Sequence, residues 1–328
     1  MTTTDEPKTR QSPPPAQPPR PPQRPGDRIF SASAKYAGVL ILVVLAAVAV
    51  FLLVEGWPAI STPTDELTKS INWLEGHSVL AYVGPLVFGT ILAALIALVI
   101  ATPIAIGVAL FISHYAPRRV ASGLGYVIDL LAAIPSVVYG LWGFLWLMPR
   151  IQPFTEWLTT YFGWIPLFAG PAANPARTIL TAGIVLAVMV LPIITAVSRE
   201  IFLQTPTLHE EAALALGATR WEMVRMAVLP FARSGIVSAT MLGLGRALGE
   251  TMAVAMVLSP GLMYSVFILQ AGQQQNIAAN IALKFPEASG LGVNVLIFTG
   301  LVLFVITLLV NMFARWIVSR RAEFSGAN

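Results

Sequence analysis

Apolar residues along this chain are gathered into long runs that polar segments separate. The runs occupy about 36–54, 85–113, 123–148, 178–198, 234–258 and 293–317. Because a helix rises 1.5 Å per residue, about 20 apolar residues cross the hydrocarbon core of a bilayer. The pattern therefore predicts an all-α membrane protein with six transmembrane helices. An even number of spans places both chain ends on the same side of the membrane.

Composition supports the membrane class. The 328 residues are 56% hydrophobic and 11% charged, and the mean hydropathy is +0.75. These values lie outside the range of soluble globular domains. The chain has no cysteine, which excludes disulfides and thiolate metal sites.

The N-terminal segment differs from the rest of the chain because it is rich in proline. Such a composition cannot bury apolar surface. We expect residues 1–28 to form a disordered cytoplasmic tail and residues 29–328 to form the membrane domain. The first apolar run starts far from Met1 and lacks a small-residue cleavage site after Val54, so we interpret it as an uncleaved anchor.

Basic residues predict the orientation. Assigning the loops alternately to two sides puts most Lys and Arg residues on the side of the termini, and this side also holds the loop 199–233. Positive residues accumulate on the cytoplasmic side, so we expect both termini and the loop 199–233 to be cytoplasmic. The other side holds Lys69, Arg150, Arg177 and Lys284.

The chain offers no apparatus for soluble catalysis. No Gly-rich run ends in Gly-Lys-Ser or Gly-Lys-Thr, so we expect no nucleotide hydrolysis by a P-loop. His77, His114 and His209 lie apart without metal-ligand spacing. We expect no catalytic residue, no metal site and no cofactor in this chain, and no nucleic-acid partner.

Prolines and charges interrupt the apolar runs. Pro103, Pro135 and Pro192 free backbone carbonyls, either at breaks that line a cavity or at simple kinks. If the fifth helix begins near Ser234, Arg246 lies about 18 Å along it, past the middle of the hydrocarbon core. A central Arg costs about 2.5 to 3.5 kcal/mol on insertion scales, so it normally faces protein or water.

Glu250 lies four residues after Arg246, where a continuous helix would let the two side chains pair. One interpretation is that the pair neutralises itself and holds the helices together. The other is a polar station on a path for oxyanions, which suit the planar donors of Arg. Nearby Gly243, Gly245 and Gly249 reduce the bulk of the helix and favour the second interpretation.

The loop 199–233 contains Glu211-Ala212-Ala213, then Gly217, then Leu229-Pro230. This spacing resembles the cytoplasmic coupling loop of ATP-binding-cassette importer permeases, although Ala227 stands where that family usually has Ile. The resemblance implies a six-helix type I importer permease of the MetI-like kind, with a loop that docks on a separate ATPase. The implied coupling residues are Glu211, Ala212, Ala213, Gly217, Leu229 and Pro230.

Two further motifs narrow the resemblance. Ile134–Gly143 in the third run and Gly245–Thr251 in the fifth resemble the PstC permeases of bacterial phosphate-specific transport systems. The resemblance implies a phosphate channel in the bacterial plasma membrane. It also implies a second permease like PstA, two ATPase subunits like PstB that bind ATP and Mg²⁺, and a phosphate-binding protein like PstS. The implied pathway residues are Ser136, Arg246, Glu250 and Thr251.

Other functions stay open on the sequence alone. The chain could be a permease for another oxyanion or small solute, or an ion-driven carrier. It could also be a membrane sensor or adaptor, in which the proline-rich tail binds a signalling partner.

Overall fold

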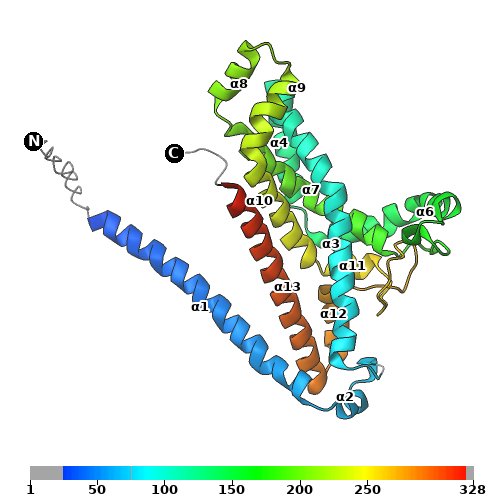
Figure 1. The fold of residues 1–328 in the computed structure, drawn as a ribbon. Coiled ribbons are helices and arrows are strands. Elements are labelled where there is room, and N and C mark those ends of the chain that lie inside the picture. Colours follow the sequence, from blue (N-terminus) through cyan, green and yellow to red (C-terminus); the bar gives the residue numbers. More distant parts are fainter. Residues whose placement is uncertain (1–24, 75, 323–328) are drawn as a thin grey trace, which may run out of the picture. The chain divides into compact units, whose positions relative to one another are not determined.

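The structure is a computed structural model that describes residues 25–74 and 76–322 (Figure 1). The predicted tail therefore lies almost entirely outside the described residues. The chain divides into two units, Met1–Val50 and Phe51–Asn328. Helix α1, Pro25–Ser61, continues from the first unit into the second.

The described part of the second unit is built from helices and the segments that connect them. Its first half contains α2 (Thr64–Ser70), α3 (Val79–Leu110), α4 (Arg118–Ala132), α5 (Ser136–Trp142) and α6 (Met148–Phe162). Its second half contains α7 (Ile179–Leu203), α8 (Thr207–Ala215), α9 (Arg220–Met223), α10 (Leu229–Leu248), α11 (Met252–Val257), α12 (Ile277–Lys284) and α13 (Leu291–Ala322). Single π-turns, Phe111–Tyr115, Gly143–Leu147 and Val224–Val228, extend or join helices. Short 3₁₀ turns lie at Asn72–Leu74, Pro166–Phe168 and Phe285–Glu287.

Five helical segments among the described residues are long and apolar enough to cross a membrane. They are Arg28–Ser61, Val79–Tyr115, Ile179–Leu203, Arg220–Leu248 and Leu291–Trp316. A sixth span arises if Arg118–Ala132 and Ser136–Phe162, which meet at 93°, are counted together. The protein is thus a multi-pass membrane protein.

The run 123–148, predicted as one helix, is sharply bent at Pro135. Proline lacks an N–H and disfavours helical backbone in the residue before it, which ends α4 here. The Tyr139 hydroxyl donates a hydrogen bond of 2.8 Å to the Leu131 carbonyl and ties the two arms together. Pro103 and Pro192, by contrast, lie inside α3 and α7 without ending them.

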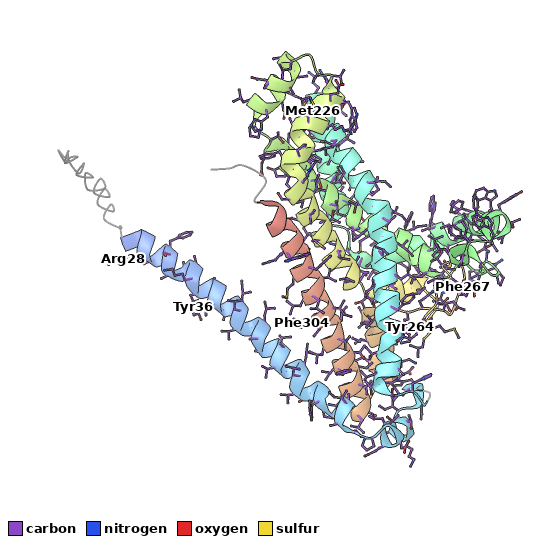
Figure 2. All side chains as sticks on the ribbon, in the orientation of Figure 1. Arg28, Tyr36, Met226, Tyr264, Phe267 and Phe304 are labelled. Atoms are coloured by element: carbon purple, nitrogen blue, oxygen red, sulfur yellow. The ribbon has the colours of Figure 1, made fainter. Side chains whose placement is uncertain are left out.

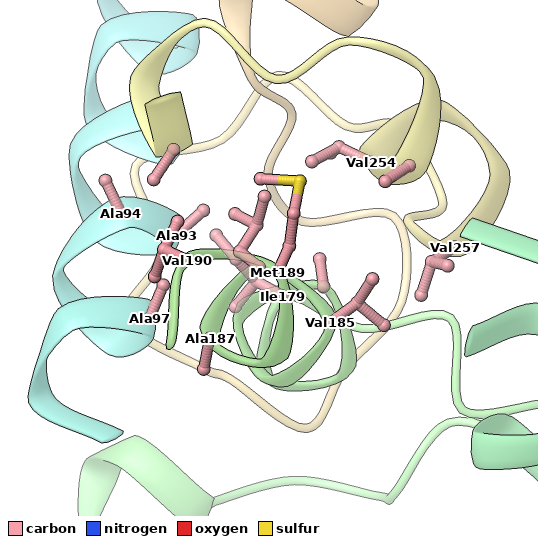
Figure 3. Packing of buried hydrophobic residues seen from close by; sticks show 14 of the residues in the cluster. Ala93, Ala94, Ala97, Ile179, Val185, Ala187, Met189, Val190, Val254 and Val257 are labelled. Carbon is pink, nitrogen blue, oxygen red and sulfur yellow. The ribbon is translucent and has the colours of Figure 1, made fainter. Parts of the chain in front are cut away.

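The main core lies where α7 packs against α3. Every fourth residue of α3 on this face is alanine, and Ala93, Ala97, Ala101 and Ala105 are buried. Small side chains let two helices approach closely, which is how helices associate in lipid. Figure 3 looks along α7 and shows Val185 and Met189 between the alanines of α3 and Val254 of α11. This core fixes the position of α11, which follows Arg246 in the chain.

Candidate functional site

Arg246 lines a cavity between α10 and α13. The cavity has a volume of about 610 Å³, and Arg246 is half-buried in it. Among the described residues, no carboxylate forms an ion pair with Arg246. The other residues that line it are Val237, Ser238, Met241, Leu242, Gly245, Asn311, Ala314 and Arg315. Two guanidinium groups, an amide and a hydroxyl therefore border one cavity that has no acidic residue in its lining.

Glu250 does not pair with Arg246. Helix α10 ends at Leu248, and Gly249 and Glu250 leave the helical path. The expected spacing of four residues on one helix is therefore lost. Glu250 is buried, and its Oε1 accepts a hydrogen bond of 3.0 Å from the Ala253 N–H at the start of α11. The carboxylate thus stabilises the restart of the helix.

The break after α10 is held by a segment from far along the chain. The Asn276 side chain donates a hydrogen bond of 2.7 Å to the Glu250 carbonyl. Its Oδ1 accepts one of 3.0 Å from the Ala279 N–H and so caps α12. Asn276 is 1% exposed. One buried amide therefore joins the break to α12.

Further buried polar groups anchor α12 to α3. The Ile277 N–H donates to the Thr90 hydroxyl at 2.9 Å, and the Tyr82 hydroxyl donates to Asn280 at 2.9 Å. A Cβ on Gly89 would lie 2.3 Å from the Gln275 carbonyl oxygen, so only glycine allows this approach. Tyr264, labelled in Figure 2, packs edge-on against Phe88 of α3. Residues 264–280 are therefore built into the helix bundle.

The two remaining predicted pathway residues lie near the break but do not line the cavity of Arg246. Thr251 is half-buried, and its hydroxyl donates to the Gly249 carbonyl at 3.3 Å. Ser136 is the first residue of α5, which packs against α11. A Cβ on Gly140 would lie 2.9 Å from the Ala253 Cα. The third and fifth apolar runs thus meet where α5 packs on α11.

The loop 199–233 forms two short helices with a turn between them. Gly217 follows α8 with a φ of +86°, which glycine adopts without steric cost. Thr219 and Glu222 then form a reciprocal capping box that begins α9. Donation from the Thr219 backbone N–H, and then from its hydroxyl, lowers the pKa of the exposed Glu222 carboxyl. Pro230 is the second residue of α10 and directly follows the π-turn Val224–Val228 and Leu229.

One side of this loop packs on the spans and the other is exposed. Ala213 and Leu229 contact the cluster formed by Ala109, Phe202 and Val228. His114, in the π-turn that follows α3, lies 3.3 Å from the Glu210 carboxylate. Figure 1 shows α8 and α9 at one end of the second unit and α2 at the other.

The exposed side carries large apolar residues beside Glu211, Ala212 and Gly217. Leu208 is 72% exposed and Leu216 is 90% exposed. Trp221 and Met226, the latter labelled in Figure 2 at the same end, are also exposed. We call Leu208, Leu214, Leu216, Trp221 and Met226 the loop patch.

Sequence reasoning missed Ser238, Asn311 and Arg315 as neighbours of Arg246. In the sequence, Arg315 is one of the basic residues near the C-terminus, which indicate only the orientation. A signal was present, because Asn311 and Arg315 are four residues apart in an otherwise apolar run and share a helical face. Asn276 was also missed as the partner of Glu250, and no local pattern connects these two residues.

Comparisons with known proteins agree on one class. The family described as "Binding-protein-dependent transport system inner membrane component" matches residues 101–323. The phosphate transport system permease protein PstC 2 of Mycobacterium bovis is 45% identical over 307 residues, which cover 92% of this chain and 94% of that protein. PstC of Mycobacterium leprae is 41% identical over 90% of this chain and 94% of its own length. PstC of Mesorhizobium japonicum is 38% identical over 92% of each chain.

Two solved structures share the fold. A chain of the MetNI methionine ABC transporter in an inward-facing conformation has a TM-score of 0.51 and 18% identity, over 76% of this chain and 97% of that chain. A chain of a bacterial ABC transporter involved in the import of alginate has a TM-score of 0.51 and 17% identity, over 89% of this chain and 99% of that chain.

Proposed function

Since the chain belongs to the family of binding-protein-dependent transport inner membrane components, and within it to the PstC phosphate permeases, we propose that it conducts inorganic phosphate in an ATP-driven importer. As a permease subunit, it works with other proteins of an ABC transporter. In our proposal these are a second, PstA-like permease, two PstB-like ATPase subunits and a PstS-like phosphate-binding protein.

The cavity of Arg246 is the observation that carries the proposal. Arg246 lies in an apolar helix, has no carboxylate partner among the described residues, and faces a space bordered by Arg315, Asn311 and Ser238. A charge in an apolar span is costly, so it normally faces protein or water and marks a functional site. Arginine donors match the oxygens of a tetrahedral anion, and the guanidinium stays charged at any accessible pH. The cavity therefore fits a passing phosphate.

In our proposal the loop 199–233 links the permease to ATP hydrolysis. Its large apolar residues are exposed, and exposed apolar patches of this kind mark sites of interaction with another protein. In our proposal the ATPase subunits, which bind ATP and Mg²⁺, cover the loop patch on the cytoplasmic side. The packed side, with Ala213 and Leu229, then passes their movement to α3, α7 and α10. The chain itself hydrolyses no nucleotide.

The orientation follows from the distribution of basic residues. Lys and Arg are concentrated near the termini and in the loop 199–233. The positive-inside rule therefore favours termini and loop in the cytoplasm of a bacterial cell.

Uptake of radiolabelled phosphate by the complete complex in ATP-loaded proteoliposomes tests the proposal. Arg246→Ala should lower uptake by about 100-fold, because hydrogen bonds to a charged group contribute about 1.5–3 kcal/mol each. Arg246→Lys should recover part of it. Arg119→Ala is the control, because Arg119 is exposed, lies outside the loop 199–233 and does not line the cavity. Full uptake by an assembled Arg246→Ala complex at low phosphate would exclude the assignment.

A further inference from the structure

A second cavity lies at the start of α7. It has a volume of about 390 Å³ and is formed by two stretches of chain that are far apart in the sequence. Its lining residues are Pro171, Ala172, Ala173, Asn174, Pro175, Arg177, Ser259, Gln270 and Ala271. The lining contains a guanidinium, two amides and a hydroxyl, but no carboxylate.

Arg177 is the charged group of this cavity, and its hydrogen bonding is incomplete. Its terminal nitrogen donates to the Leu258 carbonyl at 3.4 Å, which is a long contact. Its Nε is buried and has no hydrogen-bond partner among the described residues. Buried donors are almost always paired, so an unpaired one requires an explanation. An oxygen of a bound anion would supply the missing acceptor.

The backbone around Arg177 is fixed by cross-links between the two stretches. The Ser259 N–H donates to the Arg177 carbonyl at 3.1 Å, and the Ala173 N–H donates to the Leu269 carbonyl at 2.9 Å. Thr178 and Ala271 form an antiparallel bridge. These bonds hold the donors in place before any ligand arrives, which lowers the ordering cost of binding.

The cavity lies at the end of α7 opposite to the loop 199–233, and α11 connects it to the chain break after Arg246. Helix α7 has 25 residues and is therefore roughly 37 Å long. Arg177 precedes its first residue, whereas the loop 199–233 begins near its last turn. Leu258, which Arg177 contacts, directly follows α11, and Glu250 caps the other end of α11. A six-residue helix thus joins the cavity of Arg177 to the break after Arg246.

We propose that this cavity is a receiving site for a tetrahedral oxyanion, with Arg177 as the binding residue and Ser259 as an additional donor. The proposal rests on the proposed function for the identity of the cargo, inorganic phosphate. In the proposed orientation, with the termini in the cytoplasm, the cavity of Arg177 lies on the outer side of the membrane. Phosphate arrives from that side, so the anion meets Arg177 before Arg246. The competing explanation is that Arg177 only fastens the end of α11 to α7 through the Leu258 carbonyl.

A direct binding measurement separates these explanations. The complete complex is treated with phenylglyoxal, which modifies arginine, with and without millimolar inorganic phosphate. Modification of each arginine is then quantified by mass spectrometry. We expect phosphate to protect Arg177. Arg150 is the internal control, because its guanidinium lies on the Trp146 ring at 4.3 Å and outside the cavity.

Transport supplies the second readout. Arg177→Lys keeps the charge but loses the planar fork, so the phosphate concentration for half-maximal uptake should rise by about tenfold with a nearly unchanged maximal rate. Ser259→Ala should raise it less, because the backbone bond to Arg177 stays. Unchanged half-saturation in both variants, together with equal modification of Arg177 with and without phosphate, overturns the proposal. Protection of Arg177 by the binding protein but not by phosphate also overturns it and assigns the cavity to protein docking.

The two proposals fail in different ways. If the wild-type complex takes up no phosphate, the proposed function fails. If the wild type transports phosphate and Arg246→Ala does not, while Arg177 gives the negative results above, only the receiving site fails.

Discussion

Two regions interrupt the apolar pattern of this chain, and they differ in which side chains they expose and which they bury. The loop 199–233 is polar in sequence, yet it exposes Leu208 and Leu216. The segment 264–280 follows a broken span, yet it buries Gln274, Asn276 and Asn280. The first region leaves apolar surface for a partner, whereas the amide N–H groups of these three buried side chains donate to acceptors within the same chain. The difference indicates that the loop needs another protein to cover it, whereas the segment is held in place mainly by its own chain.

The largest expected effect is on the buried region. Asn276→Ala removes the cap of α12 and leaves the Glu250 carbonyl without its donor. Loss of a cap costs about 1 kcal/mol and an unsatisfied buried group about 1–3 kcal/mol, so we expect a stability loss of roughly 2–4 kcal/mol. Thermal unfolding of the purified complex in detergent measures it. Asn72→Ala, at an exposed asparagine, should leave the melting temperature unchanged. An equal, small effect of both substitutions would remove the contrast between the regions.

A substitution in the loop patch should have an intermediate effect, and it should change only the affinity for the ATPase. Leu216→Glu places a charge where the side chain is 90% exposed, so the stability of this chain should not change. If the ATPase covers this residue, its affinity should fall by about tenfold or more, because a buried unpaired charge opposes binding. Co-purification of the ATPase subunit at several salt concentrations measures the loss. Arg119→Glu, at an exposed residue outside the loop, serves as the control for an added acidic charge. Undiminished ATPase in the Leu216→Glu preparation would contradict the docking role of the patch.

The smallest effect on stability is expected at the contact between His114, in the π-turn after α3, and Glu210 of α8. His114→Ala removes the contact with Glu210, and a partly exposed pair of this kind contributes up to about 1 kcal/mol. Helix α8 should therefore open more often, and limited proteolysis should cut the loop a few times faster. His209→Ala is the matched control, because His209 is exposed on the same helix. Equal cleavage rates for both variants would mean that the His114 contact does not hold the loop.

Several features were predictable because they depend on short stretches of sequence. Run length and hydropathy indicated the membrane class, and the MetI-like fold expected from the loop motif is confirmed by the shared fold of two importer chains. The turn at Gly217 was also predictable, because a glycine between two helical segments is the usual residue at a positive φ.

Prolines show where local information was insufficient. Pro103, Pro135 and Pro192 lie in apolar runs, but only Pro135 ends a helix. At Pro103 and Pro192 the helices on both sides pack into one continuous core. At Pro135 the first arm packs mainly on α7 and the second mainly on α11. Proline permits a bend at each of the three positions, and the packing partners decide which of them bends the chain.

The same limit applies to the charges. The sequence by itself determined that Arg246 lies in an apolar span and that Glu250 is close to it, because spacing and hydropathy are local properties. Only the tertiary structure decided that Glu250 caps α11, that Arg246 shares its cavity with Arg315, and that Arg177 meets Leu258 across 81 residues. The last two contacts join residues that are distant in the chain, and the first depends on where α10 ends; packing of the whole bundle decides all three.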